Sequence, residues 1–539
     1  MSGYSRPYPL YELPHCDDLL HMIRQQVQED ANRVAFRFRR GKQLDQRTIG
    51  EFSSDIDALG TWLMARGLAG KHIALVAPNA YPWLVAYFAV LGSGSVIVPI
   101  DKDLPAEELG RLLAHSESVC AFAADKLAAT VAAAKPGIEV HSFSELDGLM
   151  AEGRARIAAG DRAFIDHPQD VDQLATIVYT SGTTGGSKGV MLTQANMLAD
   201  INQGCRYFDP EGPSLSVLPW HHMFGLVVAL MMLVNWRSTV FINTGLKYLL
   251  PDFQESKPVT TMMVPLHIQT FHKMVMETAR KEGKLKKLRF AMKLSLLLYK
   301  LGIDVRAKLL KDVRKPFGGA LKYILVGGAA LDPFYEREFR AWGIDLIVAY
   351  GATECSPGIA CNRNHYHRDG SVGLMVLDCE ARIADDGEVL IRGPIVMQGY
   401  WHDEEATKAA LKDGWYCSGD LGHVDADGFV YLTGRKKNLI ILSDGENVSP
   451  EALEAKIGLI EGVSEVLVYQ EGDEIAAEIF PDEGRMGDQA HFDAQIARFN
   501  EGLPPAQRIR RVVLRDKEFP KNTSRKILRH EARKESKNA

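Results

Sequence analysis

A loop rich in glycine, serine and threonine directly follows a short apolar run, and this pairing constrains the fold more than any other feature. The apolar run covers residues 174–180, and the loop continues through residues 181–189 as SGTTGGSKG. Glycines let a backbone turn tightly and bring its N–H groups close to an anion, while the hydroxyls and Lys188 add donors and positive charge. The spacing differs from the Walker consensus GxxxxGK[ST]. A flexible linker of this composition would leave the preceding strand and the lysine unexplained, so we predict a strand that ends in a phosphate-binding loop.

Apolar patterning from residue 50 onwards predicts helices that alternate with parallel strands. Apolar residues recur at helical spacing over residues 52–63 and 82–91. Strands are expected at 72–77, 96–99, 174–180, 323–326 and 345–349. Such alternation is typical of βαβ units, in which helices cover both faces of a parallel sheet. Short strands and tight turns from residue 370 to 432 predict a small antiparallel β unit.

The chain length indicates more than one domain, because 539 residues exceed what a single hydrophobic core supports. We therefore predict an α/β fold with a large N-terminal domain of βαβ layers, residues 1–434, and a small α+β C-terminal domain, residues 435–539. Seven cysteines without a CxxC pair favour a reducing compartment. A net charge of -6 gives no reason to expect a nucleic-acid partner. The N-terminus lacks the features of a signal peptide, so a cytoplasmic protein is expected.

A series of motifs in a fixed order resembles the adenylate-forming superfamily of acyl-CoA synthetases, peptide-synthetase adenylation domains and luciferases. The motifs are YTSGTTGGSKGV at 179–190, GGAALD at 327–332, YGATE at 350–354, GWYCSGD at 414–420, GRKKN at 434–438, DGENV at 444–448 and PKNTSRK at 520–526. The resemblance spans most of the chain and is greatest to long-chain fatty acyl-CoA synthetases. Motifs in this order are far more specific than any one of them alone.

The resemblance implies a site for ATP and Mg²⁺. The candidate nucleotide-binding residues are Thr180, Ser181, Gly182, Thr183, Thr184, Gly185, Lys188, Gly328, Ala329, Ala330, Tyr350, Gly351, Asp420 and Arg435. Among them, Tyr350 would pack against adenine, and Asp420 with Arg435 would bind the ribose hydroxyls. Glu354 and Thr180 match the positions that hold Mg²⁺, and Thr353 would hold the α-phosphate or the substrate carboxylate. Surface or turn positions are the commoner role for such residues, so these roles depend on the motifs.

Further residues match positions that serve the acid and the thiol. Lys526 would neutralise the charge that develops between the carboxylate and the α-phosphate, although Arg525 stands where the family usually has glycine. Lys437 matches the hinge of a mobile C-terminal domain, and Gly445 matches the channel for the thiol acceptor. His222 falls at the histidine of the acyl-pocket motif, where it would act as a pocket wall or gate.

The resemblance implies an AMP-forming acid–thiol ligase. Such an enzyme converts a carboxylic acid and ATP to an acyl-adenylate and pyrophosphate, and then transfers the acyl group to coenzyme A. A medium- or long-chain fatty acid is the favoured substrate. One alternative is an enzyme that loads the phosphopantetheine of an acyl carrier protein. Another is a non-catalytic sensor of nucleotide or acyl-adenylate, for which Arg525 is the only indication.

Residues 273–315 are strongly basic, with fourteen Lys and Arg against four Asp and Glu. Leu294, Leu297, Leu298 and Leu301 recur among these cations at helical spacing. Basic amphipathic helices often lie on anionic membrane surfaces, so peripheral membrane contact through this segment is one hypothesis. The other is a solvated helix whose apolar side packs on the main domain.

Overall fold

The computed structural model describes residues 7–41, 43–181, 187–442, 447–521 and 527–538. The chain folds into two compact units. The first consists of Met1–Ala329, Pro333–Glu380 and Ile391–Tyr416, and the second of Ala330–Asp332, Ala381–Leu390 and Cys417–Ala539. The predicted domain boundary between residues 434 and 435, beyond which the chain is expected to move as a C-terminal domain, stays a prediction.

A seven-stranded sheet lies at the centre of the N-terminal part of the first unit. Its strands, in spatial order, are β18 (Gly399–Tyr400), β8 (Ser187–Thr193), β7 (Leu174–Ser181), β4 (Val96–Ile100), β3 (His72–Val76), β5 (Cys120–Ala123) and β6 (Glu139–Ser142). The five strands from β7 to β6 pair in parallel, whereas β8 and β18 are added in antiparallel orientation. This sheet contains the predicted strands at 72–77, 96–99 and 174–180, which are therefore confirmed.

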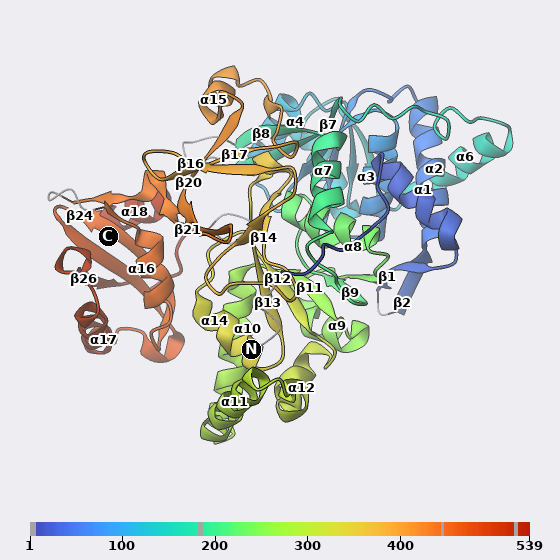
Figure 1. Cartoon of the computed structure of the whole chain (residues 1–539). Helices are drawn as coiled ribbons and strands as arrows, with labels where there is room; N and C mark the ends of the chain where they lie inside the picture. Colours follow the sequence, from blue (N-terminus) through green and yellow to red (C-terminus); the bar gives the residue numbers. More distant parts are fainter. Residues whose placement is uncertain (1–6, 42, 182–186, 443–446, 522–526, 539) are drawn as a thin grey trace. The chain divides into compact units, whose positions relative to one another are not determined.

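Helices cover both faces of this sheet, as the alternating pattern predicts. The helices α2 (Ile49–Ala65) and α3 (Tyr81–Gly92) correspond to the two predicted helices, and α2 packs on α1 (Leu19–Asp30), α3 and α6 (Leu146–Ala158) (Figure 1). Thr48 and Glu51 form a capping box that fixes the start of α2. On the opposite face, α4 (Ala106–His115) and α5 (Asp125–Ala134) bury leucine and valine side chains against β3 and β4.

A second sheet forms the other half of the first unit. Its strands, in spatial order, are β15 (Gly373–Met375), β14 (Gly358–Cys361), β13 (Asp345–Gly351), β12 (Tyr323–Val326), β11 (Thr260–Met263), β9 (Ser214–Ser216), β10 (Val240–Ile242), β1 (Val34–Arg40) and β2 (Gln43–Thr48). The strands from β13 to β1 pair in parallel, which confirms the strands expected at 323–326 and 345–349. The helices on this half include α10 (Pro265–Lys281), α11 (Leu285–Lys300), α12 (Arg306–Leu309) and α14 (Pro333–Ala341).

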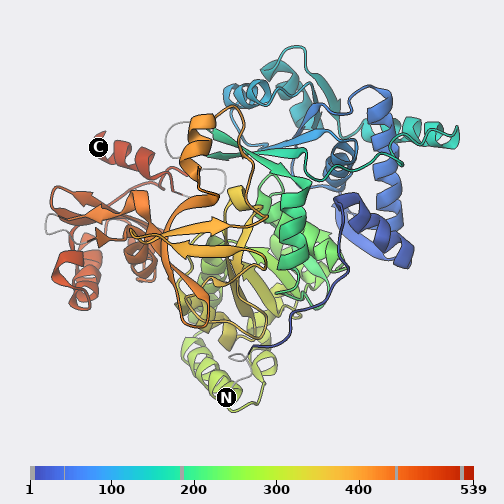
Figure 2. The same ribbon diagram turned by 45° about the horizontal axis from the view of Figure 1, so that its top comes forward.

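The second unit combines antiparallel strands with a small layered α+β fold. Its strands β16 (Glu380–Ile383), β17 (Glu388–Arg392), β20 (Trp415–Val424) and β21 (Phe429–Arg435) are neighbours in that order. A three-stranded sheet follows, made of β24 (Val463–Glu471), β25 (Glu474–Pro481) and β26 (Ile509–Leu514) (Figure 2). The helices α16 (Pro450–Ile457) and α17 (Gln489–Glu501) pack on one face of this sheet, and α18 (Arg529–Asn538) packs on the other.

The predicted fold class, α/β with parallel sheets and a smaller C-terminal domain, is confirmed. The strands of the segment at 370–432 are divided between the units, however, because β15 belongs to the first unit while most of β16, β20 and β21 belongs to the second. Turn signals identify strands but not their partners. Within the part of the chain that the structure describes, every helix is too short or too polar to cross a membrane.

Candidate active site

The glycine-rich loop connects two strands of one hairpin. β7 and β8 pair in antiparallel register, so that Thr180 lies opposite Lys188. Both residues are half-buried and lie near the end of the hairpin where the two strands meet the connecting loop. The predicted residues Gly182, Thr183, Thr184 and Gly185 lie outside the described residues, as does the side chain of Ser181. The hairpin thus brings the predicted metal-side hydroxyl and the predicted phosphate-side cation to the same place.

Tyr400 joins the phosphate loop to the YGATE motif. Its hydroxyl donates a hydrogen bond of 2.8 Å to Glu354 Oε1, and Lys188 Nζ lies 4.8 Å from the centre of its ring. Burial, followed by the charge of Glu354, raises the pKa of Tyr400 well above its usual range. The tyrosine therefore stays a neutral donor that fixes the carboxylate. Tyr400 is not among the residues predicted from the sequence, although it ends the MQGY segment at 397–400.

Glu354 sits in a short 3-10 turn, Thr353–Cys355, directly after β13. Its backbone carbonyl accepts a hydrogen bond of 2.9 Å from the Met397 backbone N–H, so both its main chain and its side chain are held by the MQGY segment. Gly351 precedes this turn, and a Cβ there would lie 2.2 Å from the Pro357 carbonyl oxygen. Glycine is required because the chain must pass this close to itself.

The predicted nucleotide-binding residues of the GGAALD and YGATE motifs lie at the ends of neighbouring parallel strands. Tyr350 is buried near the end of β13. Gly328 and Ala329 follow β12, which pairs with β13 in parallel. Gly328 has a φ of +86°, a left-handed conformation that favours glycine. The carboxyl ends of adjacent parallel strands are where ligands bind in α/β sheets. Ala330 belongs to the second unit.

His222 precedes a π-helix, Phe224–Met231, a rare element that is found mostly at functional sites. The rings of His221 and His222 lie 4.2 Å apart between centroids, and His221 Nε2 lies 3.3 Å from Asp101 Oδ2. Asp101 is buried directly after β4. Asp101 is not among the residues predicted from the sequence, because only its place after the strand expected at 96–99 could have indicated it.

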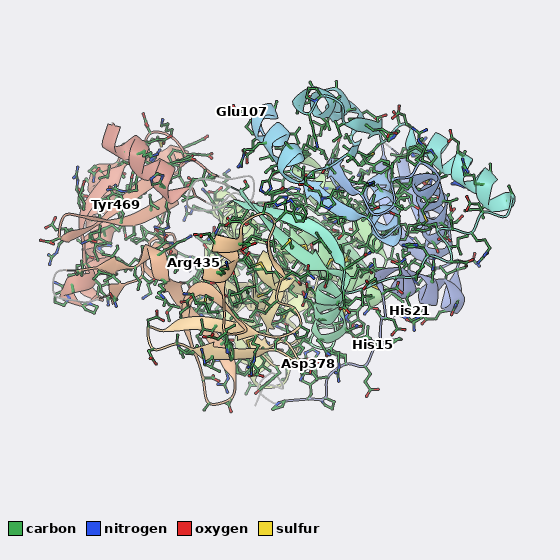
Figure 3. The ribbon with its side chains drawn as sticks, turned by 90° about the horizontal axis from the view of Figure 1, so that it is seen from above. His15, His21, Glu107, Asp378, Arg435 and Tyr469 are labelled. Atoms are coloured by element: carbon green, nitrogen blue, oxygen red, sulfur yellow. The ribbon has the colours of Figure 1, made fainter. Side chains whose placement is uncertain are left out.

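Asp420 and Arg435 form an ion pair within the second unit. They lie directly opposite each other on β20 and β21, and Arg435 Nε is 2.7 Å from Asp420 Oδ1 (Figure 3 labels Arg435). Asp420 is buried, whereas the arginine side chain is 44% exposed. Ser418 donates a hydrogen bond to the Val389 carbonyl at 2.6 Å and accepts one from the Asp420 backbone N–H at 3.0 Å. The serine hydroxyl therefore holds the backbone of Asp420 against the neighbouring strand β17.

Of the remaining predicted residues in the second unit, only Lys437 is among the residues that the structure describes. Lys437 lies in a 3-10 turn, Lys436–Asn438, at the end of β21. Gly445 and Lys526 lie outside the described residues, as does Arg525. The residues on either side of 522–526, which include Lys526, are described. Lys521 and Ile527 form an antiparallel bridge, and Lys521 makes an ion pair with Glu465.

The oxygen donors predicted to hold Mg²⁺, on Glu354 and Thr180, are of a kind that fits this ion. Magnesium is usually bound by one or two carboxylates together with substrate phosphates and water, and it prefers oxygen ligands. Glu354 supplies a carboxylate and Thr180 a hydroxyl, and Tyr400 leaves the carboxylate further acceptor sites. Within the described ranges, no group of three or more His, Cys, Asp or Glu side chains could by itself hold a metal.

Comparison with known proteins identifies the family. The model of the family described as AMP-binding enzyme matches residues 23–401. The chain belongs to this family. The AMP-binding match includes the phosphate loop, YGATE and Tyr400, and it ends before Asp420 and Arg435. It confirms the recognition made from the motifs.

Relatives of this AMP-binding enzyme include ligases for different acids. The chain is 31% identical over 497 residues to the long-chain-fatty-acid–CoA ligase FadD15 of Mycobacterium bovis, covering 87% of this chain and 82% of that protein. It is 27% identical over 518 residues to the indoleacetate–CoA ligase of Aromatoleum aromaticum, covering 89% and 91%. The crystal structure of ATP-bound MatB from Rhodopseudomonas palustris superposes with a TM-score of 0.78 at 24% identity, covering 97% of this chain and 99% of that chain, and shows the same fold.

Proposed function

We propose that this AMP-binding enzyme is an acid–CoA ligase. A carboxylate oxygen of the acid attacks the α-phosphorus of ATP, pyrophosphate leaves, and an acyl-adenylate forms. The CoA thiol then attacks the acyl carbonyl and AMP leaves. The observation that carries the proposal is the cluster of Lys188, Tyr400 and Glu354, which places a cation and a fixed carboxylate beside the phosphate loop. The named activities of the two relatives, both CoA ligases, support it.

The proposed roles follow the chemistry of each group. Lys188 and the loop at 181–187 bind the ATP phosphates, and Thr353 binds the α-phosphate or the carboxylate. Glu354 and Thr180 hold Mg²⁺, which when bound neutralises phosphate oxygens. Tyr350 packs against adenine, Gly351 and residues 328–330 bind the nucleotide, and Asp420 and Arg435 bind the ribose hydroxyls. Lys526 neutralises charge in the first step, Lys437 acts as the hinge, Gly445 lines the thiol channel and His222 lines the acyl pocket.

A medium- or long-chain fatty acid is the proposed substrate. The 31% identity to a ligase for long-chain fatty acids supports it, whereas the indoleacetate ligase supports an aromatic acid as the rival. A carrier-protein phosphopantetheine is the second acceptor to compare, since the phosphopantetheine thiol is the same group that CoA presents.

The test is acid-dependent pyrophosphate release from ATP and Mg²⁺, with and without CoA. The panel runs from acetate to oleate and includes indoleacetate and benzoate. We expect release and thioester formation with the longer fatty acids, lost on Lys526→Ala because the developing charge is then unshielded. Thioester formation with aromatic acids alone would overturn the substrate class. Release that accelerates with holo-acyl carrier protein and not with CoA would overturn the acceptor. Nucleotide binding without pyrophosphate release from any acid would favour a sensor.

A further inference from the structure

Helix α11 has apolar side chains on two opposite sides. Leu288, Met292 and Tyr299 are buried on one side. Phe290, Leu297 and Leu301, by contrast, are 69%, 57% and 68% exposed. Because a helix turns once every 3.6 residues, positions 290, 297 and 301 share one side that faces away from the buried positions. Of the four leucines noted in the sequence, Leu297 and Leu301 therefore lie on the outer side, whereas Leu294 and Leu298 are half-buried.

The inner side of α11 has its packing partners within the first unit. The helix packs on α10, α12 and α14, and Ser295 Oγ donates a hydrogen bond of 2.8 Å to the Ala341 carbonyl at the end of α14. Figure 1 shows α11 beside α10 and α12 at one end of this unit. The outer side is thus not needed for the packing of the unit, and its three large apolar groups face solvent.

The charge of α11 has one sign only. Its basic residues are Lys286, Lys287, Arg289, Lys293 and Lys300, all exposed, and the helix contains no acidic residue. Not every cation of residues 273–315 contributes to this surface. Arg306 and Arg314 are buried, the first paired with Asp345 at 3.0 Å and the second bonded to the Gly343 carbonyl. The surface charge is therefore concentrated on α11 more than on the segment as a whole.

We propose that the outer side of α11 docks on the surface of an anionic phospholipid bilayer. Phe290, Leu297 and Leu301 would enter the boundary between headgroups and acyl chains, as the apolar sides of interfacial helices do. Lys286, Lys293 and Lys300 would extend along that surface and place their ammonium groups among the lipid phosphates. This interaction is additional to the proposed ligase activity and does not depend on it.

Charge complementarity favours lipid over a second copy of the chain. Two α11 helices packed by their outer sides would bring ten cations together without a single carboxylate on either helix. Such like-charge contacts disfavour association. An anionic bilayer supplies both an apolar layer for the exposed apolar side chains of the outer side and negative charge for the lysines beside them.

The experiment is cosedimentation of the full-length protein with vesicles. One set contains equal amounts of phosphatidylcholine and phosphatidylglycerol, and the other contains phosphatidylcholine alone, each at ionic strengths of about 0.05 M and about 0.5 M. The variants are Leu297→Glu/Leu301→Glu and Lys286→Gln/Lys293→Gln/Lys300→Gln. Leu44→Glu is the matched control, because Leu44 is also exposed, at 49%, and lies on β2. Thermal unfolding checks that each variant keeps its fold.

We expect binding to the anionic vesicles at low salt, with about ten-fold weaker binding at high salt and in both α11 variants. Leu44→Glu should bind as the unaltered protein does. The proposal is overturned by no cosedimentation at low salt, by equal binding to neutral vesicles, or by binding that the α11 variants leave unchanged. Self-association in light scattering that Leu297→Glu/Leu301→Glu abolishes, without vesicle binding, would instead assign the surface to a second copy.

Discussion

The hydroxyl of Tyr400 lies 2.8 Å from Glu354 Oε1 and donates a hydrogen bond to it. The bond connects β18, at the edge of one sheet, to the turn that follows β13 in the other sheet of the first unit. Because Lys188 also lies over the tyrosine ring, this one side chain touches both groups that we assign to the triphosphate and its metal. Tyr400 is thus a positioning residue for Glu354.

Replacing this tyrosine tests the assignment. We expect Tyr400→Phe to raise the Mg²⁺ concentration needed for half-maximal pyrophosphate release about ten-fold, because a hydrogen bond to a charged group contributes roughly 1.5–3 kcal/mol. The rate at saturating Mg²⁺ should fall less. Tyr81→Phe is the matched control, since Tyr81 Oη also donates to a carboxylate, that of Asp55, at 2.8 Å. If Tyr81→Phe shifts the Mg²⁺ dependence equally, Tyr400 has only a structural role.

The Asp420–Arg435 pair gives a second test. Asp420→Asn removes the charge that accepts from two ribose hydroxyls, so we expect KM for ATP to rise about ten-fold, a loss of about 1.4 kcal/mol. The KM for the acid should stay the same. Asp386→Asn is the control, because Asp386 is also ion-paired, with Lys436, and the proposal gives it no contact with nucleotide. An unchanged KM for ATP in Asp420→Asn would remove the ribose role.

The sequence predicts the strands that form the site better than it predicts the contacts between them. The strands that carry Thr180 and Tyr350, and the strand that ends just before Gly328, all lie where the apolar runs place them. Tyr400 and Asp101, however, meet their partners across 46 residues and across 120 residues of chain, respectively. No local pattern encodes such pairings, because they depend on which strands become neighbours. In the same way, apolar spacing identified α11 as a helix but could not tell its buried side from its exposed side.

Asp200 makes the stability of the first unit depend on pH. It lies on α7 (Gln194–Gly204), where its carboxylate accepts a hydrogen bond of 2.9 Å from the Gly358 backbone N–H. Burial raises the pKa of this carboxyl to about 7. The native state therefore holds a proton that the unfolded chain releases near pH 4, and stability falls by about 1.4 kcal/mol per unit as the pH rises from about 4 to about 7.

Asp200→Asn keeps the shape and the acceptor but removes the ionisation. In denaturant unfolding, we expect the variant to gain about 2 kcal/mol relative to the unaltered protein between pH 5.5 and pH 7. Asp166→Asn serves as the control, because the Arg162 guanidinium lowers the pKa of Asp166 and this carboxyl stays ionised over that range. Equal slopes in the Asp200 variant and the unaltered protein would mean that Asp200 is ionised in the native state already at pH 5.5.

Arg306 links α11 to the start of β13 within the first unit. Its guanidinium is buried, lies 3.7 Å from the centre of the Tyr299 ring on α11 and 3.0 Å from Asp345 Oδ1 at the start of β13. Arg306→Gln leaves the Asp345 carboxylate buried without its main counter-charge, so we expect about 3–5 kcal/mol lower stability in denaturant unfolding. Arg66→Gln removes an arginine from an exposed pair with Glu139 and should cost less than about 1 kcal/mol. Because the outer side of α11 does not include Arg306, an Arg306→Gln protein that still folds should bind anionic vesicles as before. A loss of vesicle binding without a loss of stability would place Arg306 at the lipid surface instead of in the core.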